Sequence, residues 1–487
     1  MRTFKVLTHF LAVAACGALC VACGTDDAAT TATGADDAAT DNDLGALDAA
    51  DGTADAAGTD DAADAVTEDT APDIAYSDAP FETASHNALP QLVFGGVGVL
   101  HNPQIVTVTF ANDPLADQFE VFGAQIQKTQ WWASWSAGYC SSAGKCIGTG
   151  GSDKVRLGVT AAKSYTDTTA DPADPTKPYA ASSIQQFIAN QLDAATLPAP
   201  VTDTVYVIYF PQGTQISLAG GPGQPVSKSC QAFGGYHHSL PYGGRQVAYA
   251  VLPECKNGDP GMTQVESVLF SASHEIAESA TDPYTNPNAQ ASPYGGYNIN
   301  VEDLNVLAWV FALGGGEVGD LCPNLPYGGF GYATTTDTTP QYKVTRVWSN
   351  VAAKANHNPC VPADPGPYFN MAPEKNKGTD VNIELGQSKT IALHAFSDMK
   401  VQPWTVTAID IDSFQGGGTP LTFDFNGQSS VTVNNGDIVN MTITRDYNAQ
   451  PAQAYGAIAM IMSTSADGQS TNYWPIWSYT QKELTGK

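Results

Sequence analysis

The sequence has little positive charge and, after residue 23, no long apolar run. Its 487 residues include 21 Lys and Arg against 49 Asp and Glu, a formal net charge of −28. Because proteins bind nucleic acids chiefly through the negative phosphates, this charge argues against a nucleic-acid partner. A membrane-spanning helix needs about 20 apolar residues, so the mature chain is predicted to have none. No internal repeat is visible.

Most of the excess acidity lies in one segment near the N-terminus. Residues 24–87 contain 17 Asp and Glu and no Lys or Arg, mixed with Ala, Thr and Gly. Such a composition cannot bury enough apolar surface to offset the entropy lost on ordering. The sequence therefore predicts a disordered acidic linker over residues 24–87.

A signal sequence precedes this linker. Arg2 and Lys5 stand before the apolar stretch 6–22, as in a signal peptide over residues 1–23. Small residues followed by cysteine, the pattern of a bacterial lipobox, end at both Cys16 and Cys23. We predict lipidation at Cys23, because the apolar core before it has full length. The chain is then an exported lipoprotein of the bacterial envelope, anchored to the outer membrane or cell surface; a plain secretory signal is the alternative.

Six cysteines remain after the signal sequence, and none of them forms a C-x-x-C metal pair. An even number of cysteines in an exported chain is typical of disulfide bonds. Sequence alone allows many pairings. We predict the sequential one, in which each bond closes a local loop: Cys140–Cys146, Cys230–Cys255 and Cys322–Cys360.

Residues 88–363 alternate between strand-like and helix-like segments. This order predicts an α/β domain with a mixed sheet, similar to the upper half of a zincin metallopeptidase. Strands are expected over residues 104–110, 155–159, 204–210, 246–252 and 342–348, and helices over 117–135 and 183–192.

Short alternating segments separated by turn residues fill residues 364–487, which predicts an accessory β-sandwich domain. The expected strands are 381–385, 390–396, 404–411, 421–425, 431–433, 438–444, 457–463 and 473–479. Trp404, Trp474 and Trp477 are expected in its core; as exposed platforms they would instead indicate carbohydrate binding.

A further helix is expected over residues 263–280. Thr263 and Glu266 form a capping-box pattern at its start, and Pro283 prevents its continuation. Apolar residues recur between these limits at helical spacing: Val265, Val268, Leu269, Ala272, Ile276 and Ala277.

This helix carries the pattern H-E-x-x-E. His274 and Glu278 are one turn apart on one face, with Glu275 beside them. The arrangement resembles the zincin motif H-E-x-x-H with its second His replaced by Glu. We predict His274 and Glu278 as metal ligands and Glu275 as the general base. Solvated side chains on a helix surface are the alternative.

A hydrolytic zinc site needs a third protein ligand and an open position. Glu317 and Asp320, in a Gly-rich loop before Cys322, are the candidates, and Glu317 is preferred. His237, or its neighbour His238, could be a ligand or could stabilise an oxyanion, and we assign His237 a catalytic role.

The ligand set predicts a zinc-dependent hydrolase, a metallopeptidase acting on an extracellular peptide, protein or cell-wall substrate. Carboxylate ligands leave less positive charge on the metal and also suit Mn²⁺ or Ca²⁺. A purely structural metal is the competing interpretation.

The sequence also resembles the EXORDIUM (phosphate-induced) family and related secreted bacterial and fungal proteins. The resemblance covers about residues 90–362, and residues 273–283 are its most specific part. It also includes residues 131–132, 235–237, 316–322 and 347–350. The family consists of extracellular, growth-associated proteins, so the resemblance implies a rival function. In that case the chain is a non-catalytic interaction protein with a structural metal or none.

Overall fold

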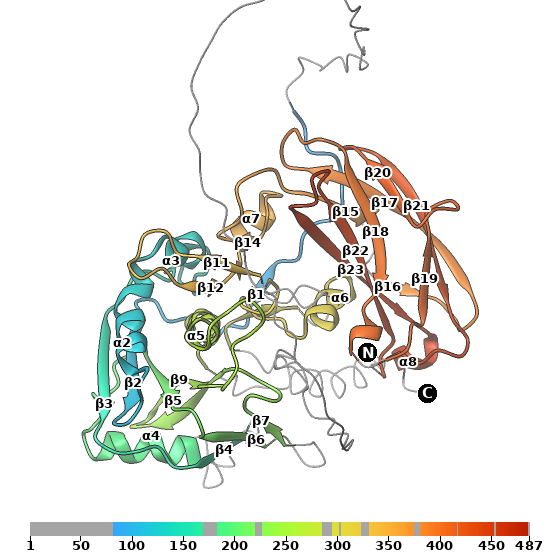
Figure 1. Cartoon of the computed structure of the whole chain (residues 1–487). Helices are drawn as coiled ribbons and strands as arrows, with labels where there is room; N and C mark the ends of the chain where they lie inside the picture. The colour runs from blue at the N-terminus through green and yellow to red at the C-terminus, as the bar shows by residue number, and fades with distance from the viewer. Residues whose placement is uncertain are drawn as a thin grey trace, which may run out of the picture. The chain divides into compact units, whose positions relative to one another are not determined.

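The computed structural model describes residues 81–168, 183–219, 226–284, 295–300, 303–322, 331–374, 380–415, 417–451 and 454–485. Within these ranges the fold is mixed α/β, with many strands and few helices (Figure 1). All of these residues except Phe81 belong to one compact unit. The predicted signal peptide and residues 24–80 of the predicted linker lie outside the described residues.

A five-stranded sheet in the order β3-β2-β5-β9-β8 organises the first half of this unit. Four strands are parallel to their neighbours, and β8 runs antiparallel to β9 at the edge. All seven residues of the central β5 are buried, as expected for a parallel strand covered on both faces. The strands are β2 (Gln104–Phe110), β3 (Ser152–Leu157), β5 (Thr204–Phe210), β8 (Tyr236–Tyr242) and β9 (Arg245–Pro253).

Helices cover both faces of this sheet (Figure 1). Helices α2 (Ala116–Gln125) and α5 (Gln264–Thr281) pack on one face, and α4 (Ser183–Asp193) packs on the other. Helix α5 contacts β9 and β8. The helices predicted over 183–192 and 263–280 are therefore present, with ends that agree to within a residue.

The single helix predicted over residues 117–135 is wrong. Helix α2 is followed by a 3₁₀ turn (Ile126–Lys128) and a separate helix α3 (Gln130–Trp135). The break falls at Thr129, whose backbone is extended and whose side chain accepts a hydrogen bond from the Trp132 amide. Thr129 therefore caps a new helix, a role that competes with continuing the old one.

Helix α5 begins as the sequence predicts. The Thr263 side chain accepts from the Glu266 amide, and the Glu266 carboxylate accepts from the Thr263 amide, which completes the capping box. The helix ends at Thr281, directly before the cap residue Asp282 and Pro283. Every residue from Ser267 to Thr281 except Ser271 is buried, so the polar side chains in its second half lie inside the protein.

Two stacked sheets form the C-terminal part. One has the order β15-β17-β21-β19 and the other β16-β23-β22-β18-β20. Ring contacts between Phe369 and Trp404 and between Phe396 and Trp474 join them. The strands are β15 (Phe369–Pro373), β16 (Asp380–Asn382), β17 (Ser388–Ser397), β18 (Trp404–Asp410), β19 (Leu421–Asp424), β20 (Ser430–Val433), β21 (Ile438–Arg445), β22 (Ala457–Thr464) and β23 (Thr471–Tyr479).

All eight strands predicted here are found, and only β15 was not anticipated. Its five residues are all buried. Trp404, Trp474 and Trp477 are at most 1% exposed. They are core residues and cannot serve as exposed carbohydrate platforms.

Smaller elements complete the unit. Strand β1 (Leu92–Phe94) pairs with β10 (Tyr297–Ile299), β11 (Tyr332–Thr334) with β12 (Lys343–Thr345), and β13 (Val347–Trp348) with β14 (Cys360–Val361). The predicted strand 342–348 is thus divided between β12 and β13. The remainder are β4 (Ser164–Thr168), β6 (Gln215–Ala219), β7 (Ser227–Lys228), α6 (Leu304–Leu313), α7 (Asn350–Lys354), α8 (Gln481–Thr485) and a 3₁₀ turn (Asp412–Gln415).

The segment just before the first sheet contacts the C-terminal strands. The Ala84 amide donates to Asn435 Oδ1 at 3.2 Å, and Asn435 Nδ2 donates to the Glu82 carbonyl at 3.0 Å. The His86 ring stacks on Phe396 with centroids 3.6 Å apart. Residues 82–86, the described end of the predicted linker, are therefore held against folded structure.

The sequential disulfide pairing is confirmed. Bonds join Cys140 to Cys146, Cys230 to Cys255 and Cys322 to Cys360. Such bonds are typical of an oxidising, extracytoplasmic environment. None of the described helices is long and apolar enough to cross a membrane.

Candidate metal centre

Helix α5 supplies three side chains to a largely buried cluster. His274, Glu275 and Glu278 are all buried, and His274 Nε2 lies 3.0 Å from Glu278 Oε1. One ligand atom from each of the three lies within 4.8 Å of the other two. The helical spacing predicted from the sequence therefore brings these groups together inside the protein.

The loop after α6 supplies two further carboxylates. Asp320 Oδ1 lies 3.6 Å from His274 Nε2, and Asp320 Oδ2 accepts a hydrogen bond from the Glu317 amide at 3.0 Å. Both predicted ligands from this loop thus belong to the cluster, because the loop folds back over the second half of α5.

The edge strand β8 supplies the second histidine. His237 Nε2 lies 2.8 Å from Glu317 Oε2 and 3.6 Å from Glu278 Oε2. His237 pairs with Ala250 of β9, on the face of the sheet that α5 covers. His238 points the other way and stacks on Tyr249, so the strand's alternation separates the two histidines.

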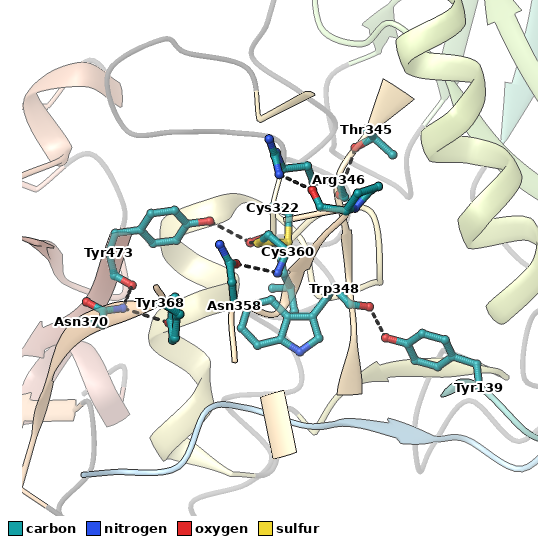
Figure 2. The surroundings of a disulfide bond; sticks show 12 residues. Tyr139, Cys322, Thr345, Arg346, Trp348, Asn358, Cys360, Tyr368, Asn370 and Tyr473 are labelled. Carbon is teal, nitrogen blue, oxygen red and sulfur yellow. Dashed lines mark hydrogen bonds between the residues drawn. A yellow bond between two sulfur atoms is a disulfide. The ribbon is translucent and has the colours of Figure 1, made fainter. Parts of the chain in front are cut away.

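A disulfide fixes the far end of the carboxylate loop (Figure 2). Cys322 is bonded to Cys360 of β14, which pairs with Trp348 of β13. Beside it, the Tyr473 hydroxyl donates to the Leu321 carbonyl at 3.0 Å. The loop is thereby tied both to a neighbouring strand pair and to β23, which limits the movement of Glu317 and Asp320.

Gly319 allows this loop to approach the helix. A Cβ atom at position 319 would lie 2.8 Å from Glu278 Oε1 and 2.8 Å from two atoms of the His274 imidazole. These distances are shorter than side-chain packing permits. The Gly319 amide also hydrogen-bonds to the Glu278 carboxylate. A larger residue at position 319 would therefore displace His274 and Glu278 from their observed positions.

Burial dominates the electrostatics of the cluster. It raises the pKa of Glu275 to about 8, and it raises the pKa of Glu278 and of Glu317 well above the ordinary range, with the charge of Asp320 adding to both. Burial also lowers the pKa of His237. The site therefore disfavours several ionised carboxylates side by side and favours the neutral imidazole of His237. A bound cation would compensate the negative charge of the carboxylates and would bind a neutral imidazole.

Asp282 is a site residue that the sequence analysis did not single out. Its Oδ1 accepts hydrogen bonds from the amides of Gly295 and Gly296, at 3.0 and 2.5 Å. Burial and then the charge of Glu317 raise its pKa to about 8. Its position directly after the motif helix is the sequence signal that could have identified it.

The donor atoms fit a divalent cation. Glu278 Oε1 is buried and has no hydrogen-bond partner among the described residues, although His274 Nε2 is 3.0 Å away. The closest donor pairs lie 2.8 to 3.6 Å apart. Tetrahedral ligands at zinc distances of about 2.0–2.1 Å lie roughly 3.3 Å apart, so the spacing suits ligands that surround an ion.

Comparisons with known proteins add no identification. No family model and no curated protein matches this sequence. Among solved structures, domain 1 of VCBP3 from Branchiostoma floridae is 9% identical, with 24% of this chain and 98% of that chain covered and a TM-score of 0.16. A FixG-related protein from Vibrio parahaemolyticus is 11% identical, with 24% and 99% covered and a TM-score of 0.17. At these TM-scores neither likeness carries an argument about function.

Proposed function

We propose that this protein is a metal-dependent hydrolase, a metallopeptidase in which Glu275 is the general base. One observation carries the proposal. The Glu275 carboxylate lies beside His274 and Glu278, with ligand atoms of the three within 4.8 Å of one another. A carboxylate next to a cation-binding pair is placed to take a proton from water that attacks a substrate.

The cation would be held by His274 and Glu278, with His237, Glu317 and Asp320 completing the set. Two imidazoles among the donors favour zinc or another transition metal over calcium, which prefers oxygen ligands alone. When bound, such an ion supplies Lewis-acid catalysis, because it polarises oxygen atoms and makes water more acidic.

The chain's own residues perform the remaining steps. Glu275 accepts the proton of the attacking water and returns it to the leaving amine. His237 belongs with the ligands in this proposal and not with the proton-transfer groups, since its Nε2 faces Glu317 and Glu278. A Cβ atom at Gly235 would lie 2.9 Å from Glu275 Oε1, so the backbone of β8's preceding turn lies close against the base.

A peptide substrate is supported by the position of β8. This strand is at the edge of its sheet and carries His237 into the cluster. An extended peptide can add to such an edge by main-chain hydrogen bonds, which would place its backbone next to the cation.

Mostly parallel strands with one antiparallel edge strand beside the motif helix also support a zincin-like architecture, followed by an accessory β-sandwich.

The envelope location belongs to the same proposal. The disulfides fit an exported protein, and lipidation at Cys23 would anchor it to the membrane. Cys23→Ser should release the protein from the membrane fraction, whereas Cys16→Ser should not. Release by Cys16→Ser alone would place the lipobox at the earlier cysteine.

Glu275→Gln tests the enzymatic claim. The zinc-loaded protein should cleave a mixed fluorogenic peptide library. Glu275→Gln should lower the cleavage rate by about 10²–10⁴ while metal content and melting temperature stay unchanged. Glu278→Gln is the matched comparison and should lose metal.

Two outcomes would contradict this proposal. Loss of metal from Glu275→Gln would make Glu275 a ligand. No cleavage of peptides or of peptidoglycan fragments by the metal-loaded protein would favour a non-catalytic interaction protein with a structural metal.

A further inference from the structure

The donor atoms of the cluster fall into two groups that share one residue. His237, Glu278 and Glu317 form one group, and His274, Glu275 and Glu278 form the other. Within each group one ligand atom from every residue lies within 4.8 Å of the others. Each group contains one histidine, and Glu278 is the member common to both.

The two carboxylate oxygens of Glu278 face different histidines. Oε1 lies 3.0 Å from His274 Nε2, and Oε2 lies 3.6 Å from His237 Nε2. A carboxylate that directs one oxygen to each of two donor groups has the geometry of a bridge between two ions. A ligand of a single ion needs only one of these oxygens.

Each histidine also has a second carboxylate of its own. His237 Nε2 is 2.8 Å from Glu317 Oε2, and His274 Nε2 is 3.6 Å from Asp320 Oδ1. The cluster is therefore two similar halves, each with one imidazole and one terminal carboxylate, on either side of Glu278.

Charge balance favours two ions as well. Glu275, Glu278, Glu317 and Asp320 are four carboxylates in a largely buried space, and the ion pairs of the last three, among the described residues, are with histidines. One divalent cation leaves half of that negative charge uncompensated, which is costly inside a protein. Two divalent cations balance four ionised carboxylates.

We propose that the cluster binds two divalent metal ions bridged by Glu278, one with His274 and Asp320 and the other with His237 and Glu317. The inference rests on the proposed metal-dependent hydrolysis and extends it. Two-metal sites with ions about 3.5–4 Å apart position both the attacking and the leaving groups in hydrolytic enzymes. Two ions held by these residues would supply separate Lewis acids for a substrate oxygen and for water, which suits the peptide hydrolysis proposed above.

Metal stoichiometry tests this inference without relying on activity. The mature protein, saturated with Zn²⁺ and then freed of excess metal, should contain two Zn per chain by mass spectrometry. Glu317→Gln and Asp320→Asn should each reduce the content to one, and Glu278→Gln should reduce it below one. Glu254→Gln is the matched control, since it neutralises another buried glutamate, whose partner is Asp113, and it should keep two.

Substitution with Mn²⁺ gives a second readout. Two bridged Mn²⁺ ions should produce a spin-coupled electron paramagnetic resonance signal, and Glu317→Gln should convert it to the signal of an isolated ion. One Zn per chain with an uncoupled Mn²⁺ signal would overturn the two-ion inference while leaving the proposed hydrolase intact. Two Zn retained in Glu317→Gln would also overturn it. No bound metal at all would overturn both.

Discussion

The imidazole Nε2 of His237 lies 2.8 Å from Oε2 of Glu317, although the two residues are 80 positions apart in the chain. One comes from the edge strand β8 and the other from the loop after α6. Their contact joins the two elements that flank the second half of α5. The cluster is therefore completed only when sheet, helix and loop are all in place.

His237 and His238 should respond differently to substitution. His237→Ala removes a donor from the cluster and should weaken zinc binding by more than about 10-fold. His238→Ala is the natural control, because that ring lies on the opposite face against Tyr249. Zinc affinity can be measured by competition with a chromophoric chelator. Equal affinities for the two variants would contradict the assignment of His237 as a ligand.

The disulfide at the end of the carboxylate loop should matter for metal binding as well as for stability. Replacing both Cys322 and Cys360 by Ser should lower the free energy of unfolding by about 2–4 kcal/mol and weaken zinc binding, because the loop that carries Glu317 is released. The pair Cys140 and Cys146, which closes a loop of only 6 residues, is the control and should leave zinc affinity unchanged. Urea denaturation and zinc titration distinguish the two effects. Unchanged zinc affinity in the Cys322/Cys360 variant would show that the loop holds its shape without the bond.

Stability should depend on pH through Glu254. Burial, and then the charge of Asp113, raises the pKa of Glu254 from 4.5 to about 8. Folding therefore takes up a proton between these values, and the free energy of unfolding falls as pH rises from about 4.5 to about 8.

Glu254→Gln should remove this part of the pH dependence. From pH 5.5 to pH 8.5, the free energy of unfolding of wild type should fall by on the order of 2 kcal/mol more than that of the variant. Urea denaturation at the two pH values measures both changes. The near-isosteric amide cannot ionise, so the difference reports the proton alone. Parallel stability curves for the two proteins would show that Glu254 titrates normally.

Truncation should locate the start of the folded unit. The composition of residues 24–80 predicts that removing them leaves the melting temperature unchanged. A chain starting at residue 88 also loses the His86 stack on Phe396 and the hydrogen bonds that join Asn435 to Glu82 and Ala84. These contacts are worth about 1–3 kcal/mol together, a drop of a few degrees. Thermal melts of chains starting at residues 81 and 88 check this, and identical melting temperatures would show that the contacts add nothing.

The sequence by itself determined the local features. The capping box at Thr263 and Glu266, the apolar spacing along α5 and the stop before Pro283 all involve residues a few positions apart, so they can be identified without a structure. The same holds for the alternating strands of the C-terminal sheets and for cysteines that pair with their sequence neighbours. Local signals can also compete: the helical pattern of residues 117–135 predicts one continuous helix, whereas the Thr129 side chain caps a new one.

Tertiary structure alone decided which groups meet. The sequence could propose that Glu317 and Asp320 lie near His274. It could not show that Gly319 lets the loop approach the helix closely. Nor could it show that the Glu278 carboxylate faces two histidines. It favoured His237 over His238 but could not show which of the two faces the site. The register of β8 on β9 settled which of them points toward α5. Such contacts depend on how distant segments pack in three dimensions, because the energy that fixes them comes from burial and from pairing across the sheet, not from neighbours along the chain.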